Sequence, residues 1–397
     1  MPRRLPKRLA SSAAVLLAAA LVACAPPAMV PAPVAPPQAN PYQPPPPAGP
    51  AKVALLLPLS GTNAKLGKAM LDAAQLALFD SGGKELELVP RDTGGTPAGA
   101  AKAARAVIAD KARLILGPLL RSEVAAAKPL AGAANVPVIA FSTATELAGG
   151  NVFLMGFLPR EEVMREVGFA RQRGHRQFAA LVPNSPYGQL MAHALRDAVP
   201  ASGGEVAQVA LYDPGQADVG AAVRQLLPGA VAGPAAPPAF DALMLPEGGE
   251  RLKAIARQLV LAGLDIKKVQ LLGSGLWDEP DTSSEPALVG GWFAAAAPQA
   301  RRGFEERFAK TYGYKPPLLA SLGYDAVALA AVLARGEGGA PFSREAILNP
   351  RGFSGVDGLF RFTPDGLVQR GLAVLQVEPQ GNTVVSPPPQ SFENLEF

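Results

Sequence analysis

Short aliphatic runs alternate with longer amphipathic runs along most of the chain. The run at residues 52–59, KVALLLPL, is continuous like a strand buried on both faces, and residues 67–80 carry apolar side chains at helical spacing. Another helix is expected at residues 98–109, with Thr96 as its N-cap and Pro97 in its first turn. The alternation continues with strands at 86–90, 114–116 and 136–141 and a helix at 123–133. It predicts a parallel sheet covered by helices on both faces.

A second series of the same design follows. It comes after residues 151–157, with strands expected at 178–182, 205–211, 241–245 and 269–272 and helices at 161–172, 187–198, 218–227 and 250–261. Helical runs at 301–312 and 318–334, a β-rich end at 356–362 and 372–377, and a loop insertion at 228–238 complete the pattern. Because one core rarely grows beyond about 250–300 residues, two lobes are expected. The predicted fold class is α/β, with two doubly wound, Rossmann-like lobes, a hinge and a central cleft.

The only cysteine, Cys24, lies where a lipoprotein signal is cut. Basic residues at positions 3, 4, 7 and 8 precede an apolar run at 9–23, and Leu21-Val22-Ala23-Cys24 resembles a lipobox. We therefore expect a signal peptide at residues 1–23 and a membrane contact through lipid on Cys24. The alternative is an apolar signal core that ends in cysteine by chance. A lipidated Cys24 leaves neither an internal disulfide nor a thiol nucleophile.

Removal of the signal changes the charge balance. The chain has 37 Lys and Arg against 33 Asp and Glu, and four basic residues lie in the signal, so the mature charge is near zero. A nucleic-acid partner is therefore not expected. Residues 24–51 form an uncharged linker with 12 prolines, which favours an extended polyproline II spacer. An unstructured filler is the alternative.

Several short motifs follow one another in a fixed order. They are residues 52–61 with Gly67, Asp92 with Pro97, Gly117-Pro118, Thr143-Ala144 with Glu146-Leu147, Tyr187-Gly188 and the Asp365-Gly366 turn. This order resembles the leucine-binding family of type I periplasmic binding proteins, over about residues 52–377. The resemblance implies two lobes joined by three crossovers. It places residues 52–157 and about 295–338 in the N-terminal lobe, 158–294 and about 339–379 in the C-terminal lobe, and 380–397 in a flexible tail.

The same resemblance implies a carboxylate site at two strand ends of the first lobe. Amino-acid-binding members use a hydroxyl four residues after the first Gly of Gly-Pro, where this chain has Arg121 followed by Ser122. They also use a Ser/Thr pair after the next strand, which Ser142 and Thr143 match. An Arg fork can hold a carboxylate or a phosphate, and a helix start suits an anion. The alternative for Arg121 is a solvated helix start.

The ammonium side of such a ligand is harder to place. Amino-acid-binding members usually carry an acid after one strand of the second lobe, where this chain has Gly275. Unless Asp278 or Glu247 reaches the ligand, a buried ammonium lacks a partner and a free α-amino acid fits poorly. We include Glu247 in the candidate cleft, with Tyr187 and Trp277 as aromatic members. The alternative for both aromatics is packing at the hinge.

No catalytic residue, cofactor or metal site is expected. His175 and His193 do not have the spacing of metal ligands. The triplet at residues 273–275, Gly-Ser-Gly, lacks the spacing of a nucleophile elbow or a phosphate loop. Paired acids such as Glu161 and Glu162 are interpreted as solvated helix positions. The sequence therefore does not indicate an enzyme.

Two non-enzymatic functions remain open. The lipobox, the spacer, LPEGG at 245–249 and LGSGLWD at 272–278 resemble the penicillin-binding protein activator branch, whose members stimulate a peptidoglycan synthase. The alternative is the substrate-binding receptor of an ABC transporter for branched-chain amino acids or amides. Ala25, in place of the aspartate of inner-membrane lipoproteins, implies anchoring in the outer membrane on its periplasmic side. That position favours the tethered regulator, in which a small amino-acid-like ligand could modulate docking.

Overall fold

The computed structural model describes residues 49–393, with gaps at 217, 228–237, 280 and 337–339. Cys24, the predicted signal peptide, most of the proline-rich linker and nearly all of the predicted loop insertion lie outside the described residues. The chain divides into two units, residues 1–46 and 47–397, and the second is described on its own. None of the helices described there combines the length and apolar character needed to cross a membrane.

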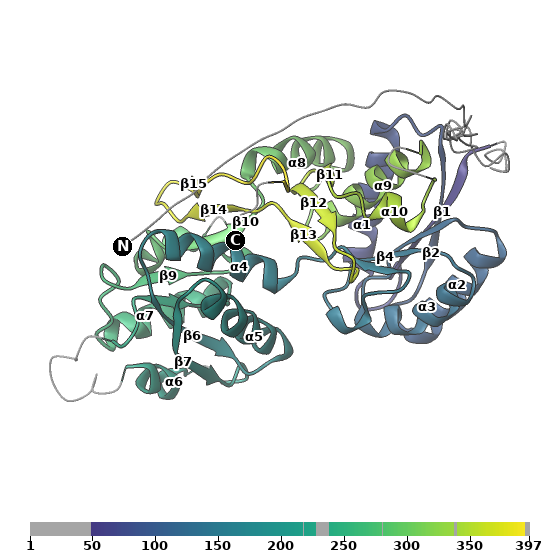
Figure 1. Ribbon diagram of the computed structural model, residues 1–397. Coiled ribbons are helices and arrows are strands. Elements are labelled where there is room, and N and C mark those ends of the chain that lie inside the picture. Colours follow the sequence, from purple (N-terminus) through teal and green to yellow (C-terminus); the bar gives the residue numbers. More distant parts are fainter. Residues whose placement is uncertain (1–48, 217, 228–237, 280, 337–339, 394–397) are drawn as a thin grey trace, which may run out of the picture. The chain divides into compact units, whose positions relative to one another are not determined.

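A five-stranded parallel sheet forms the centre of the first lobe (Figure 1). Residues of β1 alternate between its faces: Val53, Leu55 and Leu57 pack with helices α1 and α9, whereas Ala54 and Leu56 pack with α2 and α3. Both faces are covered, as the continuous aliphatic run predicts. The strand order is β2-β1-β3-β4-β5, from β1 (Ala51–Leu57), β2 (Leu86–Asp92), β3 (Leu114–Leu116), β4 (Val138–Ala140) and β5 (Val152–Leu154).

The helices of this lobe begin and end close to the predicted positions. Thr96 caps α2 as predicted, because its hydroxyl accepts the N–H of Gly99 at 3.0 Å and Pro97 is the first helical residue. Phe304 and Phe308 of α8 pack against α1. The helices are α1 (Ala64–Asp80), α2 (Pro97–Ala109), α3 (Arg121–Ala133), α8 (Pro298–Tyr312), α9 (Ala320–Ala334), α10 (Arg344–Ile347) and the 3-10 turn η1 (Thr145–Leu147).

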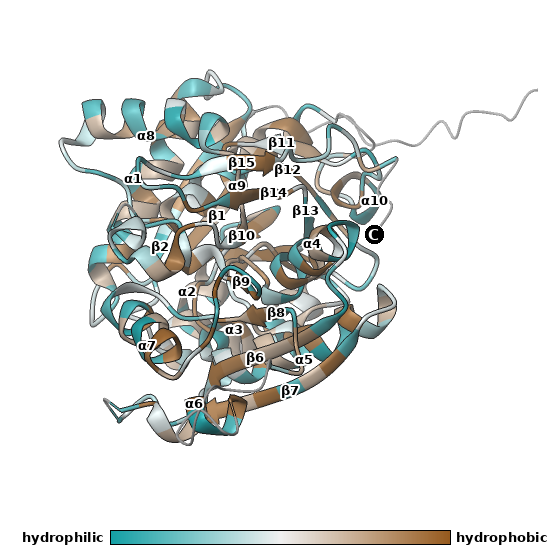
Figure 2. Ribbon diagram, turned by 90° about the vertical axis from the view of Figure 1, so that its left-hand side faces the viewer, coloured by the Kyte–Doolittle hydropathy of each residue, from teal (hydrophilic) through white to brown (hydrophobic). Residues whose placement is uncertain are grey.

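A seven-stranded mixed sheet forms the centre of the second lobe. Its order is β15-β14-β10-β9-β8-β6-β7. The five strands from β6 to β10 are parallel to one another, β14 is antiparallel to β10, and β15 is antiparallel to β14. Figure 2 shows β6 and β7 as largely hydrophobic and the outer helix α8 as largely hydrophilic. The strands are β6 (Gln177–Pro183), β7 (Glu205–Tyr212), β8 (Ala242–Met244), β9 (Gln270–Leu272), β10 (Trp292–Ala295), β14 (Ala373–Gln376) and β15 (Thr383–Ser386).

Helices cover both faces of this second sheet as well. One core layer joins α4 and α5 to Phe178, Ala180 and Val182 of β6, and the other joins α6 and α7 to Ala179 and Leu181. The helices are α4 (Pro159–Gln172), α5 (Pro186–Ala201), α6 (Gly220–Leu226) and α7 (Gly249–Leu261), with 3-10 turns η2 (Gly275–Trp277), η3 (Thr282–Ser284) and η4 (Pro286–Leu288). The two doubly wound α/β lobes predicted from the sequence are therefore confirmed.

The C-terminal part of the chain differs from the predicted lobe assignment. A small antiparallel sheet, β11 (Phe353–Gly355), β12 (Gly358–Phe362) and β13 (Val368–Arg370), buries Phe353, Phe360 and Phe362 in the core of the first lobe. Residues 342–368 therefore pack with the N-terminal lobe, whereas we expected 339–379 in the C-terminal lobe. At β14 the chain returns to the second sheet.

The predicted tail also differs from the structure. Residues Thr383–Ser386 form the edge strand β15, paired with β14. Phe392 is buried under the guanidinium of Arg361, and the Cζ of Arg361 lies 4.5 Å from the centre of the Phe392 ring. This segment therefore packs on the domain because a strand edge and an aromatic pocket receive it.

The chain crosses between the two large sheets three times, as the resemblance implies. The crossings follow β5, β10 and β13, because each of these elements packs in one lobe and its successor in the other. The three segments lie together between the lobes and supply residues to the cavities described next.

Candidate functional site

An inner cavity of about 190 Å³ lies at the three crossings. Both lobes contribute to its wall, and most of the side chains are apolar. Glu161, Glu162, Asp278, Arg301 and Arg370 are the charged exceptions. The remaining lining residues are Phe157, Leu158, Tyr187, Gly275, Leu276, Ala294, Ala295, Ala296, Leu318, Leu319 and Leu372.

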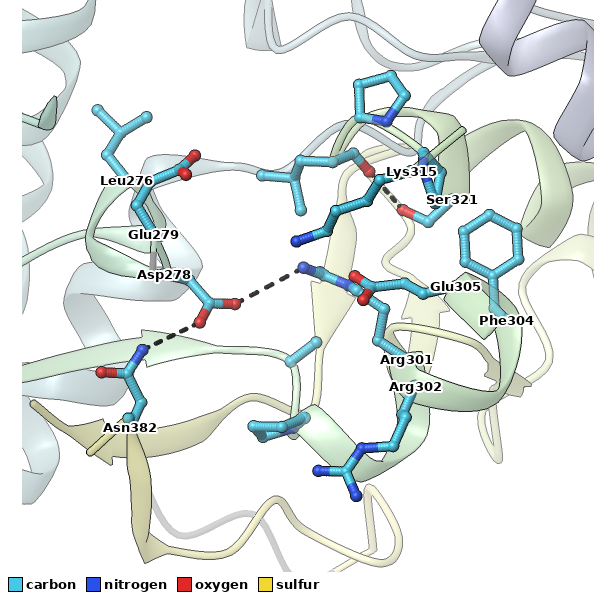
Figure 3. Close-up of a pocket in the computed structure, with 17 residues that line it drawn as sticks. Leu276, Asp278, Glu279, Arg301, Arg302, Phe304, Glu305, Lys315, Ser321 and Asn382 are labelled. Atoms are coloured by element: carbon cyan, nitrogen blue, oxygen red, sulfur yellow. Dashed lines mark hydrogen bonds and ion pairs between the residues drawn. The ribbon is translucent and has the colours of Figure 1, made fainter. Parts of the chain in front are cut away.

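A larger and more polar cavity, of about 560 Å³, adjoins the inner one (Figure 3). The two share six lining residues, among them Asp278 and Arg301. Figure 3 shows Asp278 between Arg301, 3.7 Å away, and Asn382, whose amide donates to it at 3.2 Å. Lys315, Arg302, Glu279 and Glu305 complete the charged wall, so cations and anions are equally represented. The ion pair of Asp278 with Arg301 lies where the two cavities meet, since both residues line both cavities.

Glu162 brings a carboxylate to the place where the sequence has only Gly275. It lies in the first turn of α4, which begins at Pro159, and its Oε2 accepts the N–H of Gly275 at 3.0 Å. A Cβ at residue 275 would lie 3.3 Å from Oε1, so the glycine leaves room for the carboxylate. Burial raises the pKa of Glu162 to about 7, although the Gly275 hydrogen bond opposes this shift. The interpretation of Glu162 as a solvated position is therefore wrong.

Glu161 is half-buried and Glu166 is fully buried, so neither is a solvated position. The Glu161 side chain is 10% exposed, next to Arg160 at 3.4 Å, and burial raises its pKa. Glu166, one helical turn after Glu162, is fully buried; its Oε1 accepts the N–H of Ala294 at 2.8 Å and its Oε2 has no partner. Burial raises the pKa of Glu166 well above its usual range, and the neighbouring Glu162 adds to the shift. Burial thus shifts both acids toward their protonated forms.

Tyr187 lies beside these carboxyl groups, in agreement with the expected cleft position. It belongs to the first turn of α5, which Ser185 caps by accepting the N–H of Gly188 at 3.2 Å. Its hydroxyl shares a side-chain hydrogen bond with the buried Ser274. Burial raises the pKa of Tyr187, and the nearby Glu162 raises it further. The phenol therefore stays neutral as part of the cavity wall.

Trp277 and Glu247 lie elsewhere. Trp277 has no exposed surface, and its Nε1 donates to the carbonyl of Leu245 at 3.1 Å. A Cβ at Gly273 would come within 2.2 Å of the indole, so this ring packs against backbone as part of the core. Its structure matches the packing alternative rather than a cleft aromatic. Glu247 accepts a hydrogen bond from the hydroxyl of Tyr212 and is not among the residues that line the two cavities.

The four first-lobe candidates are not brought to these cavities either. Arg121 is exposed at the start of α3 and pairs with Glu146, whose pKa it lowers through that hydrogen bond. Ser122 and Thr143 are exposed. Ser142 is buried, and its hydroxyl accepts the N–H of Ala144 at 3.2 Å. Arg121 and Ser142 are thus engaged in local contacts at the ends of β3 and β4.

The crossings also contain a charge network that the sequence did not reveal. Arg301 donates through Nε and Nη2 to one oxygen of Asp357, at 2.9 and 2.7 Å, and so links Asp357 to Asp278. Arg370 donates to the carbonyl of Met155 at 2.6 Å, and its Nε and Nη1 have no partner. Burial, with the nearby Asp357, raises the pKa of Asp325 to about 7. No local motif signals these residues, because their side chains come from five separate segments of the chain.

Metal ligation finds no support in the part of the chain that the structure describes. Among those residues, no group of three or more His, Cys, Asp or Glu side chains is arranged to hold a metal ion. The cavities instead offer hydrogen-bonding groups and apolar walls, which suit noncovalent recognition of a small molecule.

Known proteins agree with this architecture. Residues 50–382 match the family described as periplasmic binding protein. An ABC transporter substrate-binding protein from Sphaerobacter thermophilus superimposes with a TM-score of 0.70 at 23% identity, covering 88% of this chain and all of that one. A second structure is the branched-chain amino acid transporter substrate-binding protein LivJ from Streptococcus pneumoniae in complex with isoleucine. It superimposes with a TM-score of 0.59 at 21% identity, covering 85% of this chain and all of that one.

Two further comparisons extend this result. A solute-binding protein from Rhodopseudomonas palustris in complex with benzoate gives a TM-score of 0.59 at 19% identity, covering 86% of this chain and 97% of that one. The uncharacterized protein RP748 of Rickettsia prowazekii is 23% identical over 175 residues, which are 44% of this chain and 47% of that protein. The chain thus spans about half the length of this curated relative. On the match over residues 50–382, the chain belongs to the periplasmic binding protein family, with the type I fold of its leucine-binding members.

Proposed function

We propose that this protein is a non-catalytic receptor of the cell envelope that binds a small molecule between its lobes. The inner cavity of about 190 Å³ carries this proposal, since its wall combines Tyr187 of the second lobe, Leu318 and Leu319 beside α9, and the crossing segments. A molecule bound there contacts parts that shift when the lobes rotate. Differential binding would then favour one arrangement of the lobes.

Thermal unfolding of the full-length protein tests this function. Branched-chain amino acids, their amides and aromatic acids, each at about 1 mM, should include at least one compound that raises the melting temperature by mass action. Leu318→Trp narrows both cavities and should abolish the rise. Val260→Trp is the matched control, because both residues are 42% exposed and Val260 lies away on α7. If no compound shifts the wild-type protein, the receptor proposal is wrong.

The partner that we favour is a peptidoglycan synthase, with the domain held at the outer membrane by lipid on Cys24 and the spacer at residues 24–51. Arg121, at the first-lobe carboxylate position, pairs instead with Glu146, which argues against a receptor for free amino acids. A tether confines the search for a membrane-bound synthase and raises the effective concentration. Glycan polymerisation by penicillin-binding proteins should speed up when the lipidated protein is added. An unchanged rate with every synthase of the source cell would exclude this partner.

The second candidate is the substrate-binding receptor of an ABC transporter. Its support is the structural similarity to transporter proteins such as the isoleucine complex of LivJ. A receptor of this kind should stimulate ATP hydrolysis by its permease in vesicles when its ligand is present. A ligand that raises the melting temperature, stimulates a permease and leaves glycan polymerisation unchanged would favour transport over regulation.

A further inference from the structure

Glu162 is a hydrogen-bond acceptor with spare capacity on an otherwise largely apolar wall. Its Oε2 accepts the N–H of Gly275, whereas its Oε1 has no hydrogen-bond or ion-pair partner among the described residues. A carboxylate in such surroundings requires either a proton or a cation. The side that faces the inner cavity is therefore where a partner is missing.

Glu166 provides a second, independent sign of an unfilled polar position. It is fully buried one turn along α4, and its Oε1 is held by the N–H of Ala294, itself a residue of the cavity wall. Its Oε2 has no partner. Glu162 thus lines the cavity and Glu166 lies behind its wall, and each has one oxygen that accepts a backbone N–H and one oxygen without a partner.

Neither cation on this wall is paired with Glu162, although Nε and Nη1 of Arg370 have no hydrogen-bond partner. Arg301 is bound to Asp357 and Asp278, and Arg370 donates to the Met155 carbonyl while its guanidinium packs 4.7 Å from the centre of the Phe157 ring. The other ionisable groups that interact with Glu162 are Tyr187 from α5 and Glu166 from α4, and neither of them is a cation. Glu162 therefore has no cationic partner among the described residues.

We infer that Glu162 receives an ammonium group of the ligand, so that the inner cavity selects small amines with a compact apolar body and does not require a carboxylate. This inference rests on the receptor function proposed above and specifies its ligand. Leu318, Leu319 and Leu372 would contact the apolar body, and Gly275 keeps the space beside Oε1 open. Arg121 and Ser142, the first-lobe groups that would bind a carboxylate, do not line this cavity and are engaged with Glu146 and Ala144.

Binding of the amine should release a proton. Burial raises the pKa of Glu162 to about 7, so the free protein holds a proton there in mildly acidic solution. An arriving ammonium displaces that proton to solvent, and Glu162 becomes the carboxylate partner. The affinity should therefore rise about tenfold per pH unit from pH 5 to 6.5 and level off above pH 7.5.

Calorimetry of the full-length protein in detergent provides the test, with 3-methylbutylamine, leucinamide, isoleucine and benzoate as probes. The two carboxylate-free amines should bind at pH 8, and benzoate at least 10-fold more weakly. Glu162→Gln should weaken amine binding by at least 30-fold, whereas the exposed control Glu306→Gln should change it less than 2-fold. Gly275→Ala keeps every charge but crowds Oε1, and it should weaken binding by about 3- to 10-fold.

The outcomes separate this inference from the receptor function. Binding of benzoate alone, of isoleucine but neither carboxylate-free amine, or of amines equally by wild type and Glu162→Gln would each overturn the inference and leave a receptor. Failure of all four probes overturns the inference; the receptor function fails only if the wider thermal screen is negative too. Circular dichroism of each variant confirms that a lost affinity does not reflect unfolding.

Discussion

Two sets of polar residues around the cleft differ in how they are held. The first-lobe set follows β3 and β4, where Arg121 and Ser122 at the start of α3 and Thr143 in the loop after β4 are exposed. The second set is on α4, where Glu162 and Glu166 are packed against the backbone of η2 and β10. Solvent weakens the exposed ion pair of Arg121 with Glu146, whereas burial raises the energetic cost of each unpaired carboxylate on α4. A carboxyl group kept at such a cost beside a cavity is the better candidate for recognition.

This difference also explains how the chain can lack an acid at Gly275. Only the position of the carboxylate matters for a ligand, not the element that provides it. Glu162 reaches the Gly275 backbone from another helix, 113 residues earlier in the chain. A motif comparison along the sequence detects the missing residue but not its replacement.

The largest effect is expected for Trp277→Ala, which removes the support beneath the buried wall. The indole is fully buried and holds the loop that carries Gly275 through its bond to the Leu245 carbonyl. Truncation of a buried tryptophan costs about 3–5 kcal/mol. Urea unfolding should show this loss as a lower midpoint. A loss below about 1 kcal/mol would mean that the ring is a ligand contact of the kind that the sequence predicted.

A slightly smaller loss, about 3 kcal/mol, is expected for Arg301→Gln. It leaves the fully buried carboxylate of Asp357 without its two hydrogen bonds and releases Asp278. Arg302→Gln is the matched control on the next residue, which is exposed. Unfolding followed by circular dichroism should separate the two variants clearly. Equal stabilities would show that the network at the crossings contributes little.

The sequence predicts the elements well because their signals are local. The run at β1 is apolar on both faces, and Thr96 with Pro97 begins α2 whatever the rest of the chain does. The assignment of residues 342–368 to the wrong lobe has a tertiary cause. Phe353 and Phe360 would fit either core by composition, and only the packing of the third sheet decides between them.

The candidate site is less predictable for the same reason. Tyr187 was found because a short motif carries it, but Glu161 and Glu162 lie in a helix of charged composition that suggests a solvated face. One sign was available in the sequence: Glu162 and Glu166 are four residues apart and alternate with Val163 and Val167, both fully buried. That spacing is compatible with burial of the acids but does not require it.

Glu162→Gln should make stability less dependent on pH. The pKa of Glu162 is about 7 in the folded protein against an ordinary 4.5, so the folded state holds the extra proton between these values. The contribution of Glu162 to the free energy of unfolding should therefore be greatest below pH 4.5. It should fall by about 2–3 kcal/mol as the pH rises to about 7. Glutamine keeps the acceptor for Gly275 and removes this loss.

Urea unfolding at pH 5 and pH 8 measures this effect. At pH 8 the Glu162→Gln variant should be more stable than wild type by about 1–3 kcal/mol, while the exposed control Glu306→Gln should match wild type at both values. Part of the pH dependence of stability should remain in Glu162→Gln, because burial also raises the pKa of Glu166. A variant with the wild-type pH profile would contradict the burial of this carboxyl group.

The smallest effect is expected for Arg121→Ala, in the exposed first-lobe set. The pair with Glu146 is exposed on both sides, 73% and 51%, and such pairs contribute about 0–1 kcal/mol. The variant should unfold within about 0.5 kcal/mol of wild type and bind 3-methylbutylamine within 2-fold of it. If Arg121→Ala instead weakened isoleucine binding 10-fold or more, the first-lobe loops would form the carboxylate site that the family resemblance implies. The arginine would then exchange Glu146 for the ligand when the lobes close, and the contrast between the two sets would reflect the unliganded arrangement alone.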